Sequence, residues 1–110
     1  MNLKLRIATY NVESLDEGPD VFPPLSERIA ALRPYLEDLR ADVLCLQEVN
    51  AQKPDKHGHR ILAALDKLLA GTRYAEFHRA TTMSQDGEVL DIHNLVILSR
   101  FPTLEQRQFA

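Results

Sequence analysis

The chain has 110 residues, 45% of them hydrophobic, and its 16 acidic residues outnumber 13 lysines and arginines to give a formal net charge of −3. This length suits one ordinary domain with a single hydrophobic core and is too short for two. The basic residues are scattered along the chain, which argues against binding to nucleic acid mainly by electrostatic attraction, because such binding needs a basic patch or stripe.

The single cysteine, Cys45, cannot form an intrachain disulfide. It lies inside an apolar run, so we expect a buried free thiol that packs as a small hydrophobic group. A free thiol fits a reducing compartment and favours the cytoplasm. No apolar stretch approaches transmembrane length, and the N-terminus lacks the long apolar region of a signal peptide.

The first expected element is a strand over residues 3–12. Leu3, Leu5 and Ile7 alternate with polar residues, and the second face then becomes apolar as well. This pattern indicates a strand that enters the core as it proceeds and ends at Asn11. Residues 13–24 carry three prolines and a glycine and are expected to form a loop.

An amphipathic helix is expected next, with Ser26 as its N-cap. Its apolar residues recur at spacings of four, three, four and three, which places them on one helix face. Pro34 interrupts this pattern, and we expect a kink near Arg33 or two short helical pieces. The residues of the stripe are Leu25, Ile29, Leu32, Leu36 and Leu39.

Residues 43–49 read VLCLQEV and combine a continuous apolar run with a polar pair. Such a run is typical of a strand buried on both faces. Glu48 lies at the C-terminal end of this strand, which is where open α/β sheets usually bind their ligands.

The second half of the chain is expected to supply one more helix and two or three strands. A loop covers residues 50–58, and residues 61–69 form an amphipathic helix that Gly71 ends. A turn is indicated at residues 84–87. Strands are expected over residues 74–82 and 95–98, with a last weak strand over residues 104–109.

These elements predict an α/β fold with one mixed sheet of about five strands and two helices on one face. The buried runs 43–46 and 95–98 need cover on both faces of the sheet. The chain has no further element for the second face. Either another copy of the chain or a missing part of the gene product is expected to pack there.

Two polar side chains at strand ends form the best candidate site. Asn11 and Glu48 each follow an apolar strand that feeds a crossover helix, so they meet at one sheet edge if the strands are neighbours. An amide and a carboxylate oxygen suit a hard cation such as Mg²⁺. The competing interpretation is that polar residues are common wherever strands reach the surface. His93 could face the same edge, whereas the pair His57 and His59 fits a solvated loop better than a metal site.

Three segments resemble the endonuclease/exonuclease/phosphatase superfamily. They are LRIATYNV (residues 5–12), ADVLCLQEV (residues 41–49) and NLVILSRFP (residues 94–102). They occur in the family's order and span nearly the whole chain. The resemblance implies a metal-dependent phosphoesterase that uses Mg²⁺ or Mn²⁺, with Glu48 as the metal-binding glutamate and Asn11 as the active-site asparagine near that metal.

The family fold is a four-layer αββα sandwich built from two similar halves. The resemblance therefore implies that residues 1–110 are the N-terminal half of such a domain, and that the catalytic histidine–aspartate pair of the family lies outside this chain. We expect the chain to be inactive alone. His93 and Asn94 occur where the family usually has a glycine, which leaves the local substrate contacts open.

The expected substrate is a phosphate ester, and nucleic acid, a phospholipid head group and an inositol phosphate all fit the family. The alternative function is a non-catalytic interaction module that self-associates through the uncovered sheet face. In that case a homo-oligomer takes the place of the missing C-terminal half.

Overall fold

A computed structural model describes residues 4–55 and 57–109. The elements alternate between strand and helix before the chain finishes in an antiparallel pair. In chain order they are β1 (Ile7–Leu15), α1 (Leu25–Leu39), β2 (Val43–Val49), α2 (Ala63–Leu69), the 3-10 helix η1 (Arg73–Glu76), β3 (His78–Thr81) and β4 (Asn94–Ser99).

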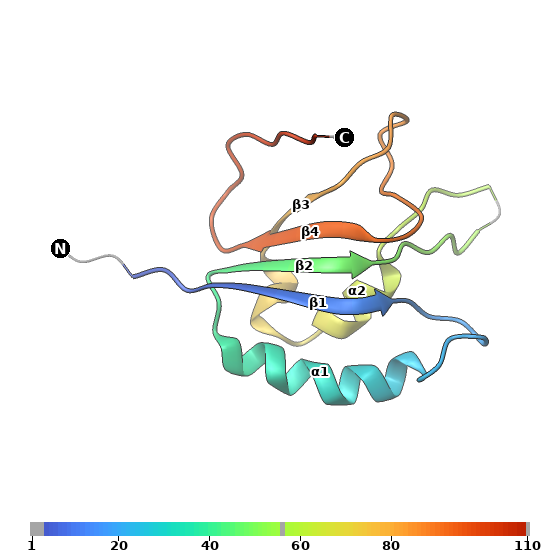
Figure 1. The fold of residues 1–110 in the computed structure, drawn as a ribbon, viewed down its shortest axis with the longest axis horizontal. Helices are drawn as coiled ribbons and strands as arrows, with labels where there is room; N and C mark the ends of the chain where they lie inside the picture. The colour runs from blue at the N-terminus through green and yellow to red at the C-terminus, as the bar shows by residue number, and fades with distance from the viewer. Residues whose placement is uncertain (1–3, 56, 110) are drawn as a thin grey trace.

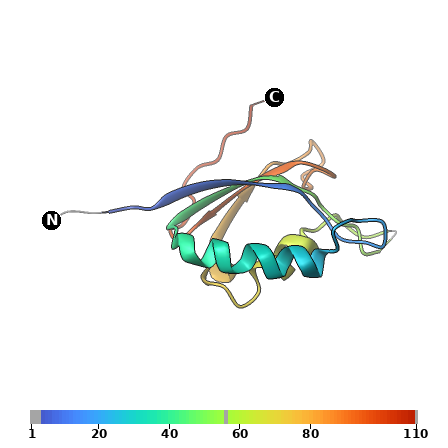
Figure 2. The ribbon, with the colours of Figure 1, turned by 60° about the horizontal axis from the view of Figure 1, so that its bottom comes forward.

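The four strands form one mixed sheet in the order β1-β2-β4-β3. Strands β1 and β2 are parallel, whereas β4 runs antiparallel to both of its neighbours. Helices α1 and α2 lie on the same face of the sheet, and the C-terminal segment leaves on the opposite side (Figures 1 and 2). The predicted α/β class, with one mixed sheet and two helices on one face, is confirmed.

The hydrophobic core lies between the sheet and the two helices. Alternation along β2 and β4 sends every second side chain to the helix-bearing face. The buried strand residues on that face are Leu44, Leu46, Val96 and Leu98. Leu36 of α1 is also fully buried, and the other apolar residues of the predicted helix stripe pack against this core while partly buried.

Strand β1 is longer at its C-terminal end than the sequence indicated. It continues through Leu15, with a register shift against β2 between Asn11 and Leu15. Glu13 and Ser14 have φ values of 50° and 52°, so the strand carries an irregularity that periodicity does not reveal. At the other end it begins at Ile7, whereas the predicted start at Leu3 lies outside the described residues.

The two helices differ from expectation at their first turns. Helix α1 begins at Leu25 with Pro24 at its N-cap, and Ser26 lies inside the helix rather than capping it. Pro34 is accommodated within one continuous helix. Helix α2 begins at Ala63, two residues later than expected, because Ile61 forms an isolated β-bridge with Gln52 in the preceding loop.

The segment predicted as a strand over residues 74–82 is a strand only in its second half. Its first residues form η1, which Thr72 caps by accepting a hydrogen bond from the backbone of Tyr74. The Tyr74 ring is fully buried, and its hydroxyl donates to the Leu36 carbonyl at 2.8 Å and accepts from the Ala41 amide at 3.0 Å. These two bonds outweigh the β-propensity of the segment.

Replacing Tyr74 with phenylalanine is expected to destabilise the fold by about 1–3 kcal/mol, because it leaves a buried carbonyl and a buried amide without a partner. Urea unfolding of the two proteins measures this difference. Tyr35→Phe serves as the control, since Tyr35 is half exposed and is expected to change stability by less than about 0.5 kcal/mol. Equal stabilities for Tyr74→Phe and the parent would contradict this role.

Residues 104–109 form no strand, contrary to the sequence-based expectation. They are held to the sheet edge by side chains rather than by a backbone ladder. Gln106 donates to the Thr81 carbonyl at 2.7 Å, and the amide of Gln108 bonds both backbone groups of Met83 at 2.8 and 2.9 Å. Side-chain pairing of this kind leaves no periodic signal in a sequence.

The sheet face away from the helices is apolar and largely uncovered. Ile7, Leu95 and Ile97 are exposed on it to 68%, 52% and 44%. Cys45 also lies on this face and is half-buried, so the prediction of a buried thiol is wrong because no layer covers its side. Within residues 4–55 and 57–109, no helix is long and apolar enough to cross a membrane.

Candidate functional site

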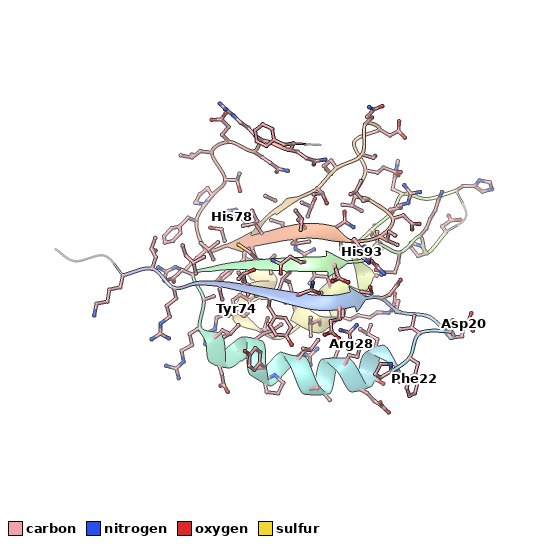
Figure 3. All side chains as sticks on the ribbon, in the orientation of Figure 1. Asp20, Phe22, Arg28, Tyr74, His78 and His93 are labelled. Carbon is pink, nitrogen blue, oxygen red and sulfur yellow. The ribbon has the colours of Figure 1, made fainter. Side chains whose placement is uncertain are left out.

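Three chain segments converge at one end of the sheet. They are the C-terminal ends of the parallel strands β1 and β2 and the residue that precedes β4, which runs in the opposite direction. Figure 1 shows the loops after β1 and β2 and the loop before β4 at this same end, and Figure 3 shows His93 there. The topology therefore gathers polar residues from three separate parts of the sequence.

Glu48 is the centre of this cluster. Its Oε2 accepts a hydrogen bond from Asn11 Nδ2 at 2.5 Å, and its Oε1 accepts one from Ser14 Oγ at 3.3 Å. The structure thus brings Asn11 and Glu48 together, as their strand-end positions implied. The Asn11 Oδ1 accepts the Glu13 backbone amide at 2.7 Å, so Asn11 acts on Glu48 as a donor in this arrangement.

His93 belongs to the same cluster. Its Nε2 lies 3.2 Å from Ser14 Oγ and 3.7 Å from Glu48 Oε1. Its backbone amide donates to Asn50 Oδ1 at 2.9 Å. Sequence reasoning considered His93 but missed Ser14, which lay in an expected loop, and Asn50, whose position directly after the 43–49 strand was the available signal.

The backbone at the cluster is unusual. Glu13, Ser14, Glu48 and His93 all have φ between 50° and 61°, a region that residues other than glycine rarely adopt. Such conformations persist when the surrounding structure holds them, and they concentrate at functional sites. Three of these four residues, Ser14, Glu48 and His93, have side chains that contact one another.

A network of polar contacts around Asn50 and Asp16 supports the cluster. Asn50 is buried and donates to Asp16 Oδ2 at 3.1 Å, and Gln52 donates to Asp16 Oδ1 at 2.9 Å. The Gln52 Oε1 in turn accepts the Ala64 amide at the start of α2 at 2.9 Å. This network joins the β1–α1 loop, the end of β2 and helix α2, so it fixes the backbone that presents His93.

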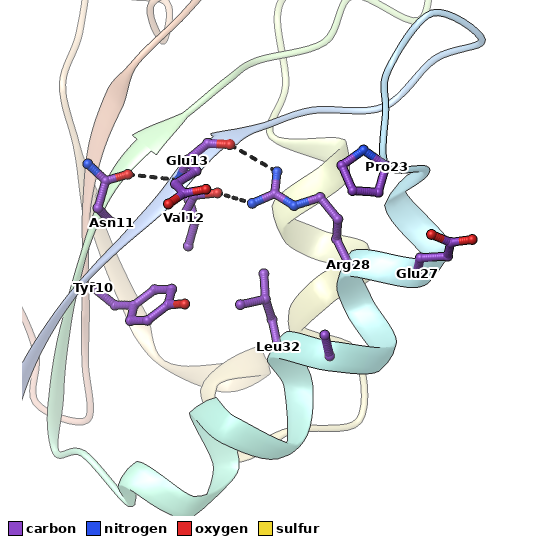
Figure 4. Close-up of a pocket in the computed structure, with 9 residues that line it drawn as sticks. Tyr10, Asn11, Val12, Glu13, Pro23, Glu27, Arg28 and Leu32 are labelled. Carbon is purple, nitrogen blue, oxygen red and sulfur yellow. Dashed lines mark hydrogen bonds between the residues drawn. The ribbon is translucent and has the colours of Figure 1, made fainter.

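Arg28 of α1 supports the end of β1. Its guanidinium donates to the carbonyls of Val12 and Glu13, the latter at 3.0 Å (Figure 4), and also to the carbonyl of Ser14 at 3.5 Å. A cleft of about 340 Å³ lies between β1 and α1, and its lining includes Arg28 and Asn11. A second cleft of about 460 Å³ is also lined by Arg28 and includes Ser14 and Asn50.

The Glu48 carboxylate is the group in this cluster that could bind a hard cation. The Glu48 side chain is 34% exposed, and among the residues the structure describes it has no lysine or arginine within 4.0 Å. No three His, Cys, Asp or Glu side chains in that part of the chain gather closely enough to hold an ion. A carboxylate with solvent access and without a lysine or arginine beside it fits Mg²⁺, which keeps several waters and takes few protein ligands.

The remaining sequence candidates lie elsewhere. The backbone amide of His57 bonds Asp55, and His59 Nδ1 lies 2.7 Å from Glu88 Oε1, a hydrogen bond that holds the pKa of the Glu88 carboxyl below its usual value. Neither imidazole joins the cluster around Glu48.

Asn94 is fully buried and has a structural role. Its Oδ1 accepts from the Thr82 hydroxyl and the Leu90 amide, and its Nδ2 donates to the Val49 and Leu90 carbonyls. All its hydrogen-bonding groups are thus used to join β2 to the loop before β4. The side chain of His93 is therefore the one from this dipeptide that reaches the site.

Comparison with known proteins gave one match. The model of the endonuclease/exonuclease/phosphatase family matches residues 8–109. No curated protein and no solved structure matched the chain.

Proposed function

The chain belongs to the endonuclease/exonuclease/phosphatase family, a family of phosphoesterase and nuclease-type folds, and from this we propose that its Glu48 site takes part in metal-dependent hydrolysis of phosphate esters. The cation we propose is Mg²⁺ or Mn²⁺. The observation that carries the proposal is the 2.5 Å contact between Asn11 Nδ2 and Glu48 Oε2 at the carboxyl ends of two parallel strands.

Each residue has a separate role in this proposal. Glu48 binds the cation through its exposed carboxylate. Asn11 orients that carboxylate through Nδ2, and its Oδ1, which accepts from the Glu13 amide, keeps a second lone pair for the cation. A divalent cation bound there would neutralise the phosphate charge and the departing oxygen.

We infer that the site is incomplete as a catalytic unit. Among the described residues, the cluster holds one carboxylate and one imidazole, and no second histidine or carboxylate lies beside them to activate a water molecule. We infer that residues 1–110 act as the N-terminal half of a larger unit whose other residues supply the general base. The substrate class, whether nucleic acid, phospholipid head group or inositol phosphate, is set by that other part.

The proposal is tested by cation binding and by turnover of the same preparation. Isothermal titration with Mn²⁺ is expected to show one site per chain, because Glu48 offers one exposed carboxylate. Hydrolysis of bis(p-nitrophenyl) phosphate with Mg²⁺ or Mn²⁺ is expected to stay at the EDTA background. Absence of binding at millimolar Mn²⁺ would overturn the metal site. Robust Mg²⁺-dependent turnover that Glu48→Ala abolishes would overturn the inference that the site is incomplete.

A second candidate function is favoured by the exposed sheet face. Ile7, Leu95 and Ile97 are large apolar side chains exposed on this face, and exposed apolar patches often mark interaction sites. The second candidate is a module that pairs two copies of the chain through this face, as two sheets pack in a sandwich. Pairing through Leu95 and Ile97 and cation binding at Glu48 use different residues, so the two functions are compatible.

A further inference from the structure

Three donor atoms from three chain segments form a small triangle beside β2. Ser14 Oγ lies 3.3 Å from Glu48 Oε1 and 3.2 Å from His93 Nε2, and the third side, between Glu48 Oε1 and His93 Nε2, is 3.7 Å. Each atom carries a lone pair that can point to the middle of the triangle when the imidazole is neutral and protonated on Nδ1.

The size of this triangle matches one face of a metal coordination shell. Divalent cations bind oxygen and nitrogen donors at about 2.0–2.2 Å, which sets neighbouring ligands about 2.9 Å apart in an octahedron and about 3.5 Å apart in a tetrahedron. Two sides of the triangle fall inside this range. The third exceeds it by about 0.2 Å, which a small rotation of an exposed side chain removes.

The backbone presents these donors at some cost. Ser14, Glu48 and His93 each have positive φ, and none of them is a glycine. The Asn50 side chain holds the His93 backbone by accepting a hydrogen bond from its amide. Asn50 in turn donates a hydrogen bond to Asp16. These contacts hold the backbone at His93 and so limit the directions that its imidazole can take.

We propose that His93 Nε2 is a ligand of the cation that binds at Glu48, with Ser14 Oγ as the adjacent donor. This inference rests on the proposed function and adds a specificity to it. Imidazole nitrogen suits transition-metal ions, whereas Mg²⁺ prefers an all-oxygen shell. His93 therefore makes the site less selective for Mg²⁺ than an all-oxygen site would be.

The direct test is electron spin echo spectroscopy of the full chain with one equivalent of Mn²⁺. A ¹⁴N modulation from a bound imidazole is expected in the parent protein and is expected to vanish in His93→Gly. Glycine is the chosen replacement because it adopts positive φ readily and so preserves the backbone. The same substitution is expected to weaken Mn²⁺ binding by at least about tenfold.

Two further variants make the result decisive. His78 lies on β3 and pairs with Ser99, which is at the opposite end of β4 from His93. His78→Ala is therefore expected to leave the ¹⁴N signal unchanged. If His93→Gly does not fold, His93→Asn tests the same point, because asparagine also tolerates positive φ. Mn²⁺ binding that depends on Glu48 but shows no ¹⁴N modulation would overturn the role of His93 and leave the proposed function intact. No Mn²⁺ binding by the parent would overturn both.

Discussion

Replacing Glu48 with glutamine is expected to weaken Mn²⁺ binding by at least about a hundredfold, because loss of an outer-shell partner alone costs about 10–100-fold and Glu48 is proposed as the direct ligand. The substitution keeps the shape of this partly exposed side chain, although its single carbonyl oxygen takes the position of only one of the two carboxylate oxygens that accept from Asn11 and Ser14. The fold is therefore retained while the negative charge is lost. Isothermal titration measures the change in affinity.

Thermal and chemical unfolding provide a second measurement of the same effect. Mn²⁺ at a hundred times its dissociation constant stabilises a protein by about 2.7 kcal/mol, so this increment is expected in the parent and absent in Glu48→Gln. Glu76→Gln is the matched control, since Glu76 lies in η1, just before β3 at the far end of the sheet from His93. Equal Mn²⁺ affinity in Glu48→Gln and Glu76→Gln would remove Glu48 from the site.

Replacing Ile97 with lysine is expected to convert a self-associated chain to monomers. Ile97 lies on β4, an inner strand of the sheet, on the face without helices, opposite Cys45 in the register. A charge placed at the centre of an apolar interface costs at least about 2 kcal/mol, or about thirtyfold in the dissociation constant. Light scattering after size exclusion measures the molar mass of the parent and the variant at the same concentration.

Ile61→Lys is the control for this experiment. Ile61 is exposed to 43%, almost the same as Ile97 at 44%, but it lies in the loop before α2. Its replacement is expected to leave the molar mass of the assembly unchanged. Reaction of Cys45 with a thiol reagent gives an independent readout, because a paired face protects it and Ile97→Lys exposes it. A monodisperse monomer of the parent chain at high concentration would contradict self-association.

The location of the site could be predicted because it depends on backbone topology. Apolar runs that end in Asn11 and Glu48 identify two strands, and parallel neighbours place their carboxyl ends at one edge of the sheet. The contact between these two side chains follows from that topology. The apolar stripe on α1 could be predicted for a similar reason, because helical periodicity indicates which face of the helix packs on the core.

The finer geometry depended on tertiary contacts that a linear pattern does not record. Ser14 enters the site because β1 continues through an irregular backbone, and nothing in the sequence around it marks a positive φ. Tyr74 looked like a strand residue, but its hydroxyl is bonded to groups at positions 36 and 41 in the core. Long-range bonds of this kind override local propensity.

Burial of the sheet was only half predictable. The runs 43–46 and 95–98 are apolar on both faces, which indicated cover on both sides. In the structure only the helix-bearing face is covered, so Cys45 is half-buried and Ile97 is exposed. The sequence thus describes a strand suited to an environment with a further layer. Both proposals for this chain, a larger catalytic unit and a pair of copies, supply that layer.

The central claim is that a cation at Glu48 binds a phosphate group, and electron–nuclear double resonance with Mn²⁺ and inorganic phosphate tests it most directly. A ³¹P coupling that shows phosphate bound to Mn²⁺ is expected in the parent chain and is expected to be absent in Glu48→Gln. Mn²⁺ bound at Glu48 without any ³¹P coupling at saturating phosphate would contradict a phosphoesterase site.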